Sequence, residues 1–94
     1  MTAAMLQSEL FRSQMAELNE EQQQLILTSL NRARDGKPTP GVENHWDSDY
    51  LLWPCGPQTE YRVLLRPLTQ SEVEAETGEA RDGFYLIQIE PSPA

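Results

Sequence analysis

The spacing of hydrophobic positions along the chain changes near residue 35. Before that point, apolar side chains recur three or four positions apart, which is typical of one face of a helix. Residues 2–34 contain no proline or glycine, whereas all five glycines and all seven prolines lie from Asp35 onward. The pattern predicts helices in the first third of the chain, beginning with residues 4–17, and short strands after it.

A helix boundary is predicted at Asn19. Its side-chain oxygen can accept a hydrogen bond from a backbone N–H in the first turn of a following helix, and Gln22 can return the bond, as in a capping box. We expect a second helix from Glu20 to about residue 34, ended by Gly36 in the left-handed conformation. One continuous helix bent at Asn19 is the alternative.

Three short strand-like runs follow, at residues 50–53, 60–68 and 84–89. Pro54 should stop the first run, and the turn residues 55–59 should join it to the second as an antiparallel hairpin. In the last run, alternate positions should face the core; they are Tyr85, Ile87 and Ile89.

Residues 69–77 begin like a helix. An isolated helix of this length is marginal in water. We therefore expect a poorly packed helical turn or a mobile loop there.

These elements predict an α+β fold, with two N-terminal helices followed by a three-stranded, mainly antiparallel β-sheet. A chain of 94 residues is the size of one small domain. We expect it to divide into a helical part, an acidic loop, the sheet and a tail, at residues 1–34, 35–49, 50–90 and 91–94.

Charge bears on the class of partner. Fifteen acidic residues against seven basic ones give a net charge of −8. Such a chain repels nucleic-acid backbones and anionic membrane surfaces and attracts basic proteins. Apolar residues are only 38% of the chain, a shortage that a homodimer would ease.

Cysteine usage and hydropathy bear on the compartment. Cys55 is the single cysteine, so no internal disulfide can form, which fits a reducing compartment. The first residues do not resemble a signal peptide, and no apolar run approaches the roughly 20 residues of a membrane span. We expect a cytoplasmic protein.

The chain's one histidine lies in its only polar cluster with metal-ligand residue types. His45, Asp47 and Asp49 could bind a divalent cation from a flexible loop. A single histidine excludes the histidine-rich zinc sites, and the calcium-loop pattern is missing. The simpler interpretation is that Asp47 caps a turn and His45 is solvated, so we expect no metal and no cofactor.

No pattern indicates catalysis. Cys55 with His45 could form a nucleophile–base pair, but neither a nucleophile elbow nor a cysteine-protease signature surrounds them. Phosphate-binding glycine loops are missing as well. We expect that the protein is not an enzyme.

Aromatic and acidic residues are the candidate partner-binding groups. Trp53 is expected in the core, whereas Trp46 could anchor a docking patch. The acidic residues that we expect to contact a partner are Asp47, Asp49, Glu72, Glu76 and Glu79.

The runs YRVLLRPLT and DGFYLIQIEPSP, within residues 61–91, are loosely similar to the opening hairpin of the HicB-type antitoxin domain. The resemblance implies a small acidic regulator that binds a basic protein, and it implies no role for any single residue.

The sequence favours a small non-catalytic regulatory or adaptor protein that binds another protein with a basic surface. One alternative is an acidic inhibitor that imitates nucleic acid to occupy a basic site. A further alternative is a metal- or ligand-binding module around His45.

Overall fold

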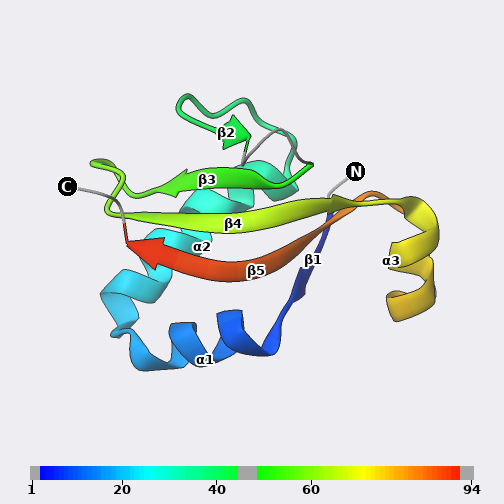
Figure 1. Cartoon of the computed structure of the whole chain (residues 1–94), viewed down its shortest axis with the longest axis horizontal. Coiled ribbons are helices and arrows are strands. Elements are labelled where there is room, and N and C mark those ends of the chain that lie inside the picture. Colours follow the sequence, from blue (N-terminus) through cyan, green and yellow to red (C-terminus); the bar gives the residue numbers. More distant parts are fainter. Residues whose placement is uncertain (1–2, 45–48, 92–94) are drawn as a thin grey trace.

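The structure, a computed structural model, describes residues 3–44 and 49–91 of the chain. Within these ranges three helices accompany a five-stranded mixed sheet with the strand order β1-β5-β4-β3-β2. Figure 1 shows α1 and α2 on the same side of the sheet, with α3 at one end of it. In chain order the elements are β1 (Ala4–Gln7), α1 (Glu9–Glu17), α2 (Glu20–Arg34), β2 (Glu43–Asn44), β3 (Leu51–Cys55), β4 (Tyr61–Leu68), α3 (Gln70–Thr77) and β5 (Gly83–Pro91).

The predicted helix boundary at Asn19 is confirmed, and the alternative of one bent helix is wrong. The Asn19 side chain accepts from the Gln22 N–H at 2.8 Å, and the Gln22 side chain accepts from the Asn19 N–H at 3.0 Å. Both halves of the capping box are therefore present, and α2 begins at Glu20.

The prediction of helix over residues 4–17 is wrong at its start. Ala4–Gln7 form β1, which pairs in parallel with β5 in the register Ala4↔Gly83 to Gln7↔Leu86. Ser8 then caps α1 by accepting from the Phe11 N–H at 3.0 Å. Four residues with helical spacing cannot form a helix alone, whereas pairing with a strand 79 positions later satisfies their backbone.

The second helix is followed by more strand than predicted. Glu43–Asn44, inside the expected acidic loop, form the short edge strand β2. Pro54 does not stop β3, which continues to Cys55. β2 pairs only with Leu51 and Leu52, so Pro54 has a strand neighbour on one side only, and proline is tolerated at such an edge.

A β-bulge changes which residues of β5 face the core. Leu64 lies opposite Gln88 and Leu65 opposite Leu86, so Ile87 is the extra residue. Leu86 and Ile89 are 2% and 7% exposed, whereas Tyr85 and Ile87 are half-buried. The predicted core face is thus correct for Ile89 and wrong for Tyr85 and Ile87, because the alternation shifts phase at the bulge.

Residues 70–77 form a regular helix, contrary to the expected turn or mobile loop. Thr69 and Glu72 make a reciprocal capping box at its start, and Gly78 ends it in the left-handed conformation with φ of 83°. Val73 is fully buried, and a Cβ built on Gly83 would lie 2.7 Å from it. Packing at this point supports a helix that would be marginal alone.

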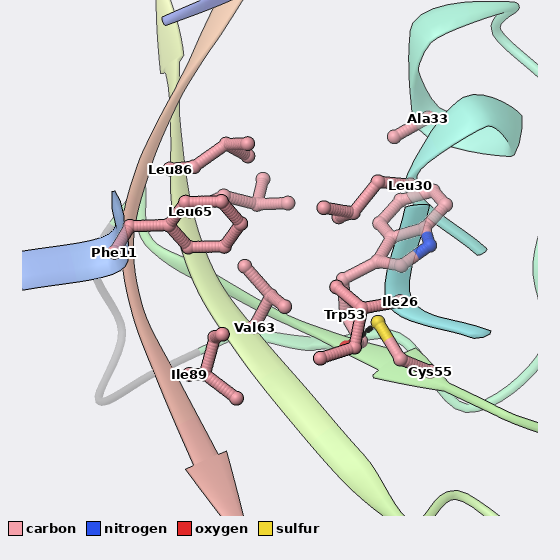
Figure 2. Packing of buried hydrophobic residues seen from close by; sticks show 10 residues of the cluster. All are labelled: Phe11, Ile26, Leu30, Ala33, Trp53, Cys55, Val63, Leu65, Leu86 and Ile89. Atoms are coloured by element: carbon pink, nitrogen blue, oxygen red, sulfur yellow. Dashed lines mark hydrogen bonds between the residues drawn. The ribbon is translucent and has the colours of Figure 1, made fainter. Parts of the chain in front are cut away.

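The core lies between the sheet and the first two helices. Figure 2 shows Phe11 of α1 beside Leu65 and Leu86, and Leu30 of α2 beside Trp53. Trp53 is 7% exposed and donates from Nε1 to the Ser29 carbonyl at 3.1 Å, which confirms its predicted place in the core. Ten buried residues make up the cluster: Phe11, Ile26, Leu30, Ala33, Trp53, Cys55, Val63, Leu65, Leu86 and Ile89.

Candidate partner-binding site

The two faces of the sheet differ in what covers them. Met5 and Phe84 are paired neighbours, and both pack against the core on the side of α1 and α2. Because side chains alternate along a strand, the next pair, Leu6 and Tyr85, points to the opposite side, which we call the outer face. Arg66 lies across from Tyr85 on β4 and shares this face.

A groove separates α3 from the outer face. Its volume is about 500 Å³. Its walls combine apolar and charged side chains, namely Leu6, Gln7, Arg66, Leu68, Glu72, Ala75, Glu76 and Tyr85. We call this hollow the outer groove.

The Glu72 carboxylate in the outer groove is held by its own protein. It accepts from the Thr69 backbone N–H at 3.1 Å and forms an ion pair with Arg66 at 3.1 Å. These contacts, the Thr69 hydrogen bond first, hold the pKa of Glu72 below its usual value. Glu72 therefore supports the start of α3 and orients Arg66.

Glu76 is the carboxylate of the outer groove that has no ion-pair partner in the described part of the chain. It is exposed, one helical turn after Glu72. None of the ion pairs found among residues 3–44 and 49–91 involves it. A cation from outside can reach it without displacing any ion-pair partner among the described residues.

The remaining predicted partner-binding residues lie elsewhere. Glu79 is exposed beyond the end of α3, faces Arg81 at 3.9 Å and does not line the groove. Asp49 is exposed just before β3. Because β3 starts opposite Leu65 of β4, Asp49 lies near the end of the sheet where β4 leads to α3. His45, Trp46 and Asp47 lie outside the described residues.

Sequence reasoning missed the apolar wall of the groove. The spacing of residues 4–17 predicts that Leu6 lies in a helix, and the alternation of residues 84–89 predicts that Tyr85 faces the core. Neither pattern reveals that β1 pairs with β5. The pairing of Leu6 with Tyr85 on the outer face therefore cannot be predicted from the neighbouring sequence. The capping-box residues Thr69 and Glu72 were the signal that could have predicted α3 as a stable helix.

Cys55 is unsuited to nucleophilic chemistry. It is fully buried, and its Sγ lies 3.6 Å from the Trp53 carbonyl oxygen. Burial raises the pKa of the Cys55 thiol to about 12. Because the thiolate is the nucleophile, a thiol with this pKa is unreactive near neutral pH.

Among residues 3–44 and 49–91, no group of three or more histidine, cysteine, aspartate or glutamate residues could hold a metal ion. Within the same ranges, none of the helices has the length and hydropathy needed to cross a membrane. The candidate ligand Asp49 is within these ranges, whereas His45 and Asp47 are not.

No protein-family model, no curated protein and no solved structure matches this chain. Strands β4 and β5 pair antiparallel, as the hairpin resemblance implies, but the eight-residue helix α3 stands in their connection.

Proposed function

We propose that this chain is a small acidic adaptor or regulatory protein that acts without catalysis. Its partner is a protein with a basic segment, and the segment binds in the outer groove. The observation that carries the proposal is the position of Glu76, a carboxylate without an ion-pair partner among the described residues, in a groove whose walls include Leu6 and Tyr85. The expected location is the cytoplasm.

A lysine or arginine side chain suits this arrangement. Such side chains bury an aliphatic stem on apolar surface while the charged head reaches a carboxylate. In the groove the stem would lie on Leu6 and Tyr85, whose ring also attracts a cation, and the head would meet Glu76. The net charge of −8 would speed the encounter with a basic partner.

Two matched variants test the site. Glu76→Lys reverses the charge in the groove, and Glu74→Lys makes the same change on the same helix at an exposed residue outside the groove. Proteins retained from native extract on the wild-type chain are identified, and the affinity of each variant for the retained partner is then measured at low and moderate salt.

We expect Glu76→Lys to weaken binding at least tenfold and Glu74→Lys to change it less than threefold. Equal losses would show that net charge, and not the groove, recruits the partner. A steep fall of affinity with salt, together with a partner that normally holds nucleic acid, would favour the nucleic-acid mimic instead.

A further inference from the structure

One edge of β1 has no strand beside it among the described residues. Just before β1 this side is covered, because the Ala3 N–H donates to the Arg34 carbonyl at 2.8 Å. β1 is the outermost strand on its side of the sheet. The Ala4 N–H donates to Asp82 at 2.9 Å and the Ser8 N–H to Leu86 at 3.0 Å, so these residues face β5. Because backbone groups alternate in direction along a strand, Met5 and Gln7 face away from β5. No backbone hydrogen bond of either residue toward that side is found within residues 3–44 and 49–91.

The two edges of the sheet are protected differently. β2, at the other edge, has two residues, and its Glu43 pairs with Arg62 at 3.6 Å. Short length and charge both discourage pairing with another strand. β1 is twice as long, and its sequence AMLQ contains neither charge nor proline.

A hollow lies on each side of this free edge. The outer groove reaches β1 through Leu6 and Gln7. On the side of the helices, a second hollow of about 320 Å³ is lined by apolar residues that include Met5, Leu27 and Leu86, and also by Asn31, Arg34 and Arg81. Leu27 is 37% exposed there, so apolar surface remains open to solvent. We call this second hollow the inner hollow.

We propose that β1 accepts an extended segment of the partner as an additional strand, with side chains alternating between the outer groove and the inner hollow. A strand points successive side chains to opposite faces, and the two hollows lie on opposite faces of β1. Strand addition gives affinity through backbone hydrogen bonds, and pockets for alternate side chains give specificity. The proposal rests on the proposed function for its acidic groove.

The chemistry of the hollows defines the occupant. Glu76 in the outer groove selects lysine or arginine. In the inner hollow, Met5 and Leu27 accept an aliphatic side chain, and Arg34 and Arg81 disfavour a basic one. The segment is therefore an extended run that alternates basic and aliphatic residues. A second copy of β1 fits less well, because AMLQ has no basic residue and brings a further net charge of −8.

A peptide probe tests the binding mode. The probe is a fluorescein-labelled octapeptide that alternates lysine and valine, and the control has the same residues in two blocks. When the alternating peptide is extended as a strand, the backbone N–H groups of all the valines point to one edge of the strand, and those of all the lysines point to the other edge. Only one set can bond to β1, so N-methylation of one set should abolish binding and N-methylation of the other should leave it intact.

Three variants locate the site. Gln7→Pro removes an outward N–H from an exposed position, where a proline is tolerated on an edge strand. Leu27→Glu places a charge in the inner hollow. Leu10→Glu is the matched control, because Leu10 is 50% exposed on α1 and lines neither hollow. We expect the first two to weaken binding of the alternating peptide at least tenfold and the third less than twofold, with melting temperatures confirming the fold of each.

The outcomes separate this inference from the proposed function. Failure of the alternating peptide to bind, equal binding of the block peptide, or equal effects of the two N-methylations would overturn strand addition. If the peptide tests fail but Glu76→Lys still loses the native partner, the proposed function of the outer groove is supported. A wild-type dimer in sedimentation that Gln7→Pro converts to monomer would show that a second copy occupies β1, and would also overturn the inference.

Discussion

The side-chain amide of Gln14 pairs with both backbone groups of Ile89. Its nitrogen donates to the Ile89 carbonyl at 2.8 Å, and its oxygen accepts from the Ile89 N–H at 2.7 Å. β1 ends at Gln7 opposite Leu86, while β5 continues to Pro91. Gln14 of α1 thus takes the position of a neighbouring strand residue where the neighbouring strand has ended.

Replacing Gln14 with alanine should destabilise the protein. Gln14→Ala leaves the N–H and C=O of Ile89 without partners at a part-buried site. Losing the partners of buried polar groups costs about 1–3 kcal/mol. The measurement is the free energy of unfolding in urea. Ser13→Ala, at the exposed neighbouring position, should change it by less than about 0.5 kcal/mol; equal values for both variants would show that the amide pair contributes nothing.

The contact between Gly83 and Val73 sets how closely α3 packs on the sheet. In Gly83→Ala, the new Cβ would lie 2.7 Å from Val73 Cγ2 and 3.1 Å from the Ala4 carbonyl oxygen. Overpacking of this kind costs about 1–3 kcal/mol.

The matched test is the double variant Gly83→Ala with Val73→Ala. Removing the Val73 methyl groups makes room for the new Cβ, so the two losses in unfolding free energy should sum to more than the loss of the double variant. Strict additivity would mean that the two side chains do not meet.

Stability should depend on the protonation of Glu72. Its pKa is lowered from the usual 4.5, first by the Thr69 hydrogen bond and then by Arg66. The stabilisation is complete above pH 4.5, where the unfolded state is also ionised, and is lost as pH falls through the lower folded pKa.

The variant Glu72→Gln isolates this effect, because glutamine can still complete the capping box. The difference in unfolding free energy between wild type and Glu72→Gln should shrink as pH is lowered from 6 to 3. Glu74→Gln, which makes neither contact, should show no such trend. A difference that stays constant with pH would contradict the role given to the Glu72 charge.

Cys55 should react with thiol reagents only when the protein opens. Its side chain is fully buried, and burial raises the pKa of the thiol to about 12. At pH 8, labelling by an aromatic disulfide should therefore be much slower than for a free thiol and should accelerate with added urea. Rapid labelling of the native protein, with its melting temperature unchanged, would place Cys55 at an accessible surface instead.

Local signals predicted the elements that local contacts define. Asn19 and Gln22 form the boundary of α2 through bonds three residues apart, and the sequence predicts both bonds. The run of residues 60–68 was predicted from its composition and its turn residues, and β4 occupies nearly the same range.

Features that depend on distant partners were not predictable in this way. Residues 4–7 have helical spacing, and only the distant strand β5 makes them a strand. The bulge at Ile87 shifts the alternation of β5 without any glycine or proline to mark it. The outer groove combines Leu6 with Tyr85, so it depends on the pairing of β1 with β5 and on the bulge at Ile87. For this reason the sequence predicts only its acidic residues, Glu72 and Glu76.

The parallel pairing of β1 with β5 has a consequence for synthesis of the protein. Residues 83–86, the partners of residues 4–7, are synthesised 79 positions later. At about 5–20 residues per second, AMLQ waits several seconds as an apolar segment without a strand to join. Although β1 precedes β5 in the chain, it can join the sheet only after β5 has been made.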